Sequence, residues 1–189
     1  MPLTTLNFSS PSSFPTGAIV KSETKVITAF GDTTVASTSS FNDLTGTEQT
    51  FTRTFADSKI LSLWNIKWSS GLNIWFNLNR KIGSGSYAVV NKGATGTQGG
   101  RTSAKQVWGA IYNQTTVNAM GYGIHASQYT FLDESGEGLT DSTDAISYKI
   151  TMSGSSTSNY LSLNIEGYAS ATNYNKTTES SVTFMEIKA

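Results

Sequence analysis

The sequence predicts an all-β protein built as a sandwich or jelly roll, and three observations support this fold class. Apolar and polar residues alternate with a period of two through many short segments. Turn-forming Gly, Ser, Thr and Asp residues separate these segments, as in sandwiches and jelly rolls. No apolar stripe with helical spacing reaches a useful length. A length of 189 residues suits one such domain.

Residues 1–17 form the first predicted element, a short N-terminal arm that holds all three prolines among Ser and Thr. An arm of this composition is flexible in isolation, so we expect a neighbouring protein to hold it. The jelly-roll domain is expected to span residues 18–189. The candidate docking residues of the arm are Leu3, Leu6, Phe8 and Phe14.

The strands are predicted from the alternation that begins at Ala18. It is clearest where Leu72, Ile74, Phe76 and Leu78 alternate with Asn and Trp residues. Long loops are expected at residues 93–103 and 134–142. The other predicted strands cover residues 26–30, 50–55, 128–132, 146–152, 161–165 and 180–189.

The segment 59–68 differs from the others because it is apolar on both faces. Leu61 and Leu63 lie on one face, whereas Ile60, Trp64, Ile66 and Trp68 lie on the other. Such a strand is expected to be buried on both sides. A two-layer sandwich covers one side only, so we expect a subunit interface to cover the other. Aromatic residues are enriched at interfaces. The candidate trimer-interface residues are Trp64, Trp68 and Trp75.

Composition excludes several classes of function. The 13 basic and 13 acidic residues cancel, so a nucleic-acid partner is not expected. The chain has no cysteine, which removes disulfides, thiolate metal sites and cysteine nucleophiles. No secretory signal and no apolar stretch near 18 residues are present, so membrane insertion is not expected. Without disulfides, oligomerisation is the expected source of additional stability.

The motifs that resemble catalytic sites are incomplete. Residues 82–90 resemble the glycine-rich loop of protein kinases, but the other kinase motifs are missing, and a hairpin turn explains the glycines. The sequence contains no nucleophile elbow that would accompany its single histidine, His125, in a catalytic triad. It also contains no further nitrogen or sulfur ligands that would complete a zinc site with this histidine. The sequence therefore predicts no catalytic residue, no cofactor and no metal ligand.

Two binding sites remain open alternatives. An exposed Trp75 or Trp108 would stack on a sugar ring in a lectin-type site. The carboxylates of the 134–142 loop and its flanks are oxygen ligands of the kind that calcium prefers, although a solvated acidic loop is favoured. These carboxylates belong to Asp133, Glu134, Glu137, Asp141 and Asp144.

A set of short segments, taken in order, resembles the C-terminal domain of tail-fibre and other virion proteins of marine tailed phages. That domain is similar in outline to the trimeric jelly rolls of the complement C1q and tumour necrosis factor families. The resemblance covers about residues 17–189. The matching segments are 17–20 (GAIV), 39–46 (SSFNDLTG), 52–61 (TRTFADSKIL), 76–80 (FNLNR), 129–133 (YTFLD), 145–150 (AISYKI) and 181–187 (SVTFMEI).

The resemblance implies a non-enzymatic jelly roll that forms a homotrimer on the virion surface, after synthesis in the host cytoplasm. Fibre proteins carry this domain after a long shaft, whereas only about 17 residues precede it here. This favours a capsid decoration or cement protein whose arm grips the major capsid protein. The alternative is a short tail fibre or knob that binds a host surface glycan through Trp108, Tyr112 and the acidic loop. A polysaccharide depolymerase that uses Asp133 or Glu137 is the third hypothesis.

Overall fold

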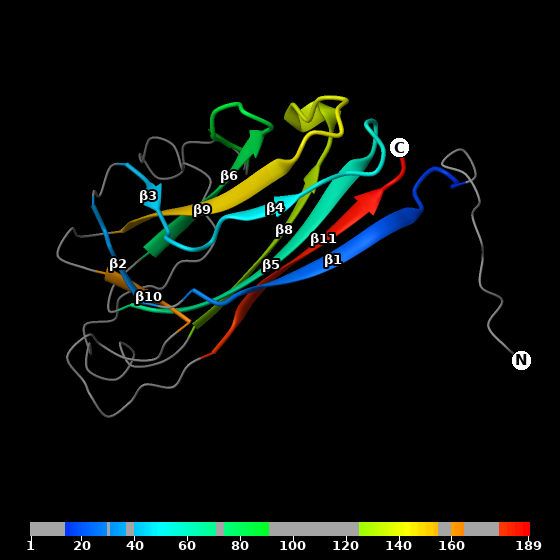
Figure 1. Cartoon of the computed structure of the whole chain (residues 1–189). Coiled ribbons are helices and arrows are strands. Elements are labelled where there is room, and N and C mark those ends of the chain that lie inside the picture. The colour runs from blue at the N-terminus through cyan, green and yellow to red at the C-terminus, as the bar shows by residue number, and fades with distance from the viewer. Residues whose placement is uncertain are drawn as a thin grey trace, which may run out of the picture.

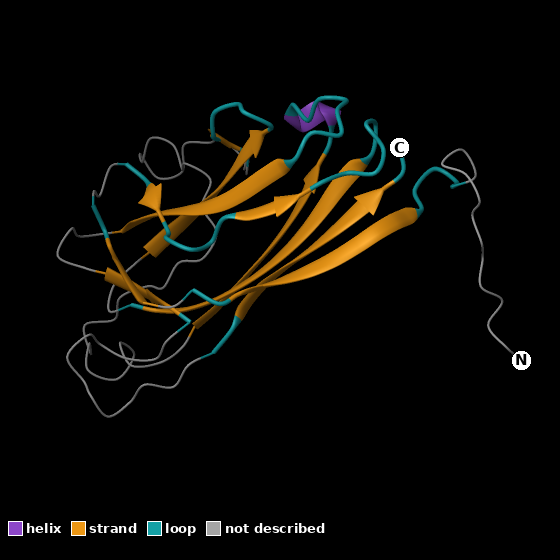
Figure 2. Ribbon diagram, viewed as in Figure 1, coloured by secondary structure: helices purple, strands orange, loops and turns teal. Residues whose placement is uncertain are grey.

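The computed structural model describes residues 14–29, 31–36, 40–70, 74–90, 125–154, 160–164 and 178–189 (Figures 1 and 2). Its one helical element there is a 3₁₀ turn, η2 (Ser135–Glu137), so no helix in these ranges is long and apolar enough to cross a membrane. The strands are β1 (Ile19–Ile27), β2 (Gly31–Thr34), β3 (Asn42–Asp43), β4 (Gln49–Phe51), β5 (Lys59–Ser69), β6 (Ile74–Ile82), β7 (Ala88–Val89), β8 (His125–Asp133), β9 (Ile146–Gly154), β10 (Tyr160–Leu163) and β11 (Ser180–Ile187).

The strands pair in a nested order that identifies a jelly roll. β1 pairs with β11, β3 and β4 pair with β9, β5 pairs with β8, and β6 pairs with β7, all antiparallel. Two further pairings, β11 with β5 and β9 with β6, join these pairs into two sheets. Two such sheets built from nested antiparallel pairs are the double Greek key of a jelly roll. The prediction of an all-β sandwich is confirmed.

The two sheets lie as layers on either side of the core (Figure 2). The first sheet runs β1-β11-β5-β8, and β10 and β2 extend it beyond the end of β11. The second sheet contains β3, β4, β9, β6 and β7. Because side chains alternate between the two faces of a strand, each strand contributes every second residue to the core between the layers.

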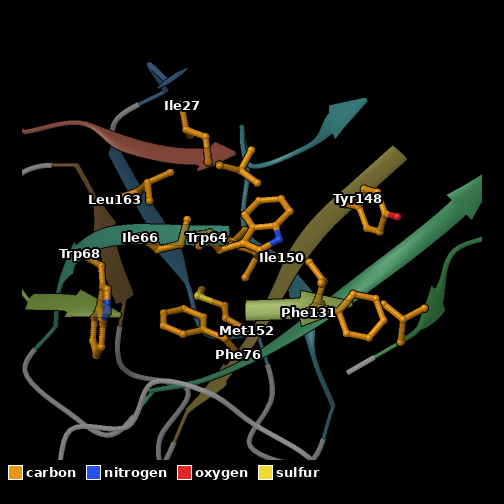
Figure 3. Packing of buried hydrophobic residues seen from close by; sticks show 14 of the residues in the cluster. Ile27, Trp64, Ile66, Trp68, Phe76, Phe131, Tyr148, Ile150, Met152 and Leu163 are labelled. Carbon is orange, nitrogen blue, oxygen red and sulfur yellow. The ribbon is translucent and has the colours of Figure 1, made fainter. Parts of the chain in front are cut away.

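The inner face of β5 forms the centre of this core (Figure 3). Trp64 and Trp68 are only 2% and 0% exposed in the single chain. The indole nitrogen of Trp64 donates to Ser62 Oγ at 3.1 Å, and that of Trp68 donates to Ser127 Oγ at 2.9 Å. The prediction that both tryptophans lie at a trimer interface is therefore wrong, because their apolar area and their polar atoms are already satisfied inside one chain.

The outer face of β5 is the less covered of its two sides. Leu61 lies between Met185 of β11 and Leu132 of β8, and it is half-buried by these neighbours. Trp75, the third candidate interface residue, is also half-buried, and it lies on the outer side of β6 in the other sheet. The expected burial of β5 on both sides is therefore complete on one side only within the chain.

The predicted strand at 50–55 ends early, at Phe51. The backbone N–H groups of Thr54 and Phe55 donate to the carboxylate of Glu186 at 2.7–2.8 Å instead of continuing a ladder. The predicted strand at 26–30 instead ends at Ile27 of β1. There the amide of Asn164 donates to the Ile27 carbonyl oxygen at 2.6 Å, which turns the chain toward β2. Side-chain groups thus replace backbone partners at both strand ends.

The end of the predicted arm packs on the domain itself. The Phe14 ring lies 6.0 Å from the Phe55 ring, and the Gly17 N–H donates to the Lys188 carbonyl at 2.8 Å. Phe14 therefore packs on the sandwich, and its expected role in capsid docking stays a prediction. The other three candidates, Leu3, Leu6 and Phe8, lie outside the described residues.

Replacing Trp64 by alanine tests its place in the core. The Trp64→Ala change should lower the free energy of unfolding by about 3–5 kcal/mol, because it removes a fully buried ring. The half-buried Trp75→Ala variant is the matched control and should lose clearly less. Urea denaturation at two protein concentrations measures both. A Trp64→Ala variant that keeps its stability but self-associates more weakly would contradict the core assignment.

Candidate functional site

The acidic segment at the end of β8 is organised around a buried carboxylate, that of Asp133. Asp133 is fully buried and forms an ion pair with Arg80 of β6. The hydroxyl of Tyr148 on β9 donates to its second oxygen at 2.6 Å. Burial raises the pKa of Asp133, and the Tyr148 hydroxyl and the Arg80 charge oppose that rise. Burial and the Asp133 charge in turn raise the pKa of Tyr148.

Two inward-pointing arginines hold the acidic loop that follows. Arg80 donates to the carbonyl oxygens of Glu137 and Gly138 at 3.1 and 3.0 Å. Arg53 donates to the carbonyl oxygens of Thr140, at 2.5 Å, and of Ser142. Both guanidinium groups are nearly buried, so each contact is charge-assisted and shielded from water. The 134–142 loop is thereby fixed to the end of the sandwich.

The carboxylates proposed as calcium ligands do not converge. Asp133 points inward to Arg80, whereas Glu134 pairs with Lys59 at 2.7 Å on the surface. Across the described ranges, no three His, Cys, Asp or Glu side chains gather as a metal site would require. Asp133 and Glu134 are therefore engaged with Arg80 and Lys59 of the chain itself.

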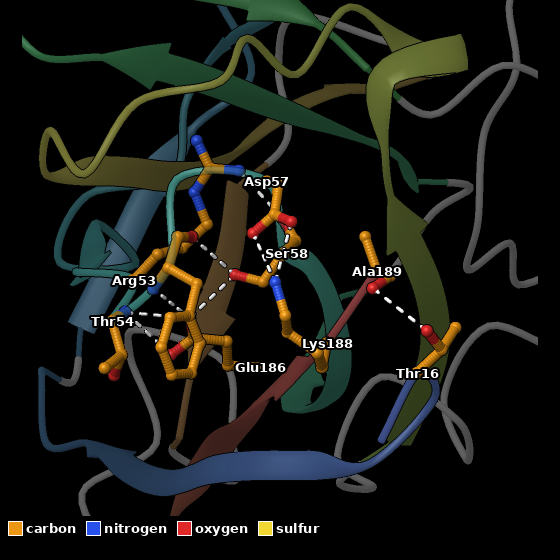
Figure 4. A network of polar contacts seen from close by, with 9 residues as sticks. Thr16, Arg53, Thr54, Asp57, Ser58, Glu186, Lys188 and Ala189 are labelled. Atoms are coloured by element: carbon orange, nitrogen blue, oxygen red, sulfur yellow. Dashed lines mark hydrogen bonds and ion pairs between the residues drawn. The ribbon is translucent and has the colours of Figure 1, made fainter. Parts of the chain in front are cut away.

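A second buried carboxylate, that of Glu186 on β11, organises the turn that precedes β5 (Figure 4). Besides the Thr54 and Phe55 N–H groups, it accepts the Ser58 hydroxyl at 2.7 Å. Glu186 is fully buried. A buried carboxylate with several donors is satisfied, and this one ties the 54–58 turn to the last strand.

The structure shows where the glycine-rich segment and the single histidine, which resembled parts of catalytic motifs, lie in the fold. Gly83 is in the turn that links β6 to β7, with a positive φ of 52°, which confirms the hairpin reading of this loop. The His125 ring lies 5.4 Å from the Trp68 ring at the start of β8. Trp108 and Tyr112, the candidate glycan contacts, lie outside the described residues.

The middle of the outer side of the first sheet presents side chains without charge, which we call the uncharged face. Lys59 and Lys67 of β5 lie on the same side, beyond its two ends. The strand registers place it as three rows of four residues across β1, β11, β5 and β8. In every position the side chain is aliphatic, hydroxyl or amide. The rows are Ser22-Met185-Leu61-Leu132, Thr24-Thr183-Leu63-Thr130 and Val26-Ser181-Asn65-Gln128.

The outer side of the second sheet is charged, in contrast. Lys149 pairs with Asp43 at 2.7 Å, and Lys81 lies 3.8 Å from Glu48. The Tyr87 ring lies between the two lysines, with their Nζ atoms 4.1 and 4.9 Å from its centroid. The sandwich thus has one face with charged pairs across it and one whose middle lacks charge.

Sequence reasoning missed the buried charges, although the alternation marks them. Arg53 is in phase with Phe51 of β4, and Glu186 is in phase with Phe184 of β11, so the side chain of each points inward. A charged residue in the inward phase signals a buried polar contact, because a buried charge needs a partner. Apart from the Ser58 carbonyl oxygen, to which Arg53 donates at 2.8 Å, the partners lie more than 50 residues away and cannot be read from the sequence.

Comparison with known proteins gives neither a matching family model nor a matching curated protein. Among solved structures, the chain is similar to chains of the T13 infectious bursal disease virus particle (10% identity, TM-score 0.46) and of the VP2 subviral particle of that virus (12%, 0.44). Each match covers 100% of this chain and 40% or 43% of the other, so the chain spans less than half of their length. With TM-scores under 0.5, the fold assignment rests on the strand pairing of the chain itself.

Asp133 should make stability depend on pH. Its folded-state pKa lies above the unfolded value of about 3.9, so the folded state binds this proton more readily. The contribution of Asp133 to the free energy of unfolding is therefore largest at low pH, falls as the pH rises from about 4, and levels off above the folded-state pKa. The Asp133→Asn variant should lack this component.

Urea unfolding of both proteins between about pH 3 and 8 tests this, with Asp141→Asn as a control in the same loop. The stability of the wild type relative to Asp133→Asn should decline with rising pH, whereas the difference between wild type and Asp141→Asn should not follow this course. A relative stability of the wild type that increases with pH would show that Arg80 outweighs burial.

Proposed function

We propose that this chain is a non-enzymatic structural protein on the surface of a tailed-phage virion, where it acts as a homotrimeric capsid decoration or cement protein. The observation that carries the proposal is the uncharged face, the middle of one side of the jelly roll, which is suited to burial against protein rather than to water. The ordered sequence segments that resemble phage virion domains support it. A homotrimer of the C1q and tumour necrosis factor type is part of the proposal.

The buried charges support a structural role rather than an enzymatic one. Asp133, which a depolymerase would use, is closed off by Arg80 and Tyr148. A glycosidase needs two carboxylates that reach a substrate from opposite sides of a cleft. In the described part of the chain, the inward charges instead hold loops and turns in place.

The arm gives the proposed attachment to the capsid. Residues 1–13 precede Phe14, which is anchored on Phe55. The apolar residues Leu3, Leu6 and Phe8 would occupy a groove or sheet edge of the major capsid protein. Such an arm adds contact area without requiring the rigid sandwich to adapt its shape.

The second candidate is a tail fibre or knob that binds a host glycan, with a tail component as its neighbour. The fixation of the 134–142 loop by Arg53 and Arg80 favours it, because a rigid loop at the end of a sandwich loses little entropy on binding. Decoration predicts hundreds of copies per particle, whereas a fibre or knob predicts only a few. Quantitative gels of purified virions separate the two candidates.

Deleting residues 1–13 tests the arm. The truncated protein should stay folded and keep its oligomeric state, because Phe14 and the Gly17 contact to Lys188 remain. It should bind isolated undecorated capsids at least about ten-fold more weakly than the full chain, the equivalent of about 1.4 kcal/mol. Co-sedimentation with capsids measures binding. Unchanged binding would contradict the role of the arm.

A further inference from the structure

We infer that Lys21 and Lys25 close the edge of the sandwich between β1 and β4, so that strands of other copies of this chain do not add to it. The inference goes beyond the proposed function and holds for any role of the chain. In the described residues, β1 pairs with β11 alone and borders the first sheet (Figure 1). β4 pairs there with β9 alone, and its contacts to β1 place it at the same edge of the sandwich.

The strand β1 has the length and composition that favour strand addition. It is nine residues long, whereas β3 and β4 in the second sheet have two and three. Its outward residues Ser22, Thr24 and Val26 are uncharged and exposed. A long, exposed and uncharged edge strand offers unpaired backbone groups to any other strand. The outward side of β1 therefore gives no protection against such pairing.

The protection lies on the inner side of β1, which carries three charges. Lys21, Glu23 and Lys25 lie in register with inward-pointing residues of β11. The side chains of Lys25 and Glu23 are 27% and 40% exposed and lie 3.2 Å apart, so both ions still contact water at the rim of the sandwich. Charged residues that point inward on an edge strand are one of the ways in which natural sheets resist edge-to-edge pairing.

The two lysines reach across the gap between the sheets. The Lys21 Nζ donates to the Thr52 carbonyl oxygen at 2.9 Å and lies 4.5 Å from the centroid of the Phe51 ring. The Lys25 Nζ donates to the Thr50 carbonyl oxygen at 2.5 Å. The ammonium groups thus bind carbonyl oxygens of β4 and of the residue that follows it. Each lysine joins the borders of the two sheets where no backbone ladder connects them.

A strand that paired with β1 would lie across this rim. Its inward side chains would cover the ammonium groups and Glu23 and would remove their water, and enclosing an ion in this way is strongly unfavourable. Turning the lysines outward instead would break their bonds to the carbonyl oxygens and would uncover Phe51, which is 1% exposed. Because both routes cost free energy, the edge stays closed in the native protein.

Replacing both lysines by threonine tests the inference. The Lys21→Thr/Lys25→Thr protein, which we call the edge variant, keeps residues that favour strands but loses two inner charges. It should stay folded, because Thr50 and Thr52 are exposed and water can replace the ammonium groups at their carbonyl oxygens. Circular dichroism checks the fold, and analytical ultracentrifugation of the full chain over a concentration series gives the particle size.

The matched control is Lys59→Thr/Lys67→Thr, which changes the net charge equally but on the outer side of β5, between β11 and β8. The edge variant should form assemblies larger than the wild-type particle, whatever the size of that particle. It should do so at protein concentrations at least about ten-fold lower than the wild type or the control needs. A folded edge variant that keeps the wild-type size, or a control that associates equally, would overturn the inference.

A nitroxide label shows which surface makes the new contact. The chain has no cysteine, so Ser22→Cys on β1 and Val89→Cys on β7 each provide a single attachment site. Two paired strands of nine residues at about 3.3 Å per residue hold their labels within about 30 Å of each other, which pulsed electron paramagnetic resonance detects.

In the edge variant, a new distance between labels should appear at Ser22 and not at Val89, compared with the same labels in the wild type. A new distance at Val89 alone would assign the association to another surface and would overturn the inference. If circular dichroism shows that the edge variant is unfolded, the single variants Lys21→Thr and Lys25→Thr are judged by the same outcomes.

Discussion

The structure depends on β5, whose inner side packs in the core and whose outer side forms part of the uncharged face. It pairs with β11 along one edge and with β8 along the other, so it joins the outermost pair, β1 with β11, to its own pair with β8. Its inner side carries Trp64 and Trp68 into the core, and its outer side carries Leu61 and Leu63 onto the uncharged face. A strand apolar on both sides is tolerated in a two-layer sandwich only where something covers the second side. The half-exposed leucines are therefore the point at which the fold and the proposed assembly meet.

Buried charge sets a second constraint on the sandwich. Arg53, Arg80, Asp133 and Glu186 all occupy inward positions, and each is matched by carbonyl, hydroxyl, N–H or ionic partners. A buried charge that loses its partner is costly, so these contacts work as a group that fixes turns and loops. They lie near one end of the sandwich, where the 134–142 loop and the 54–58 turn meet the last strand. The same end receives Phe14, so the point from which the arm extends is held by the most polar part of the interior.

The all-β class and the positions of β8, β9 and β11 could be predicted from the sequence, because a period of two is a local property. The side of β5 that faces the core could not be predicted from the sequence. Trp64 and Leu61 sit in opposite phases of one apolar strand, and the sequence does not state which phase faces the second sheet. That choice depends on the β9 and β6 residues across the core, which are distant in sequence. For the same reason, the sequence does not show that Lys21, Glu23 and Lys25 of β1 point inward. Its Lys-Ser-Glu-Thr-Lys alternation is equally compatible with charges pointing outward, and only its register with β11 places them inward.

The two faces of the sandwich differ in a way that orients the molecule within any assembly. The second sheet carries Lys81, Lys149 and their acidic partners around Tyr87, a pattern stable in water because each exposed ion keeps most of its hydration. The middle of the outer side of the first sheet offers hydroxyl, amide and aliphatic groups, for which burial against protein costs little desolvation. The ions of the second sheet are therefore suited to stay in water. In the proposed three-fold homotrimer, the three ends that hold Phe14 and the acidic loop would be equivalent by symmetry, so the three arms would start at the same level along the axis.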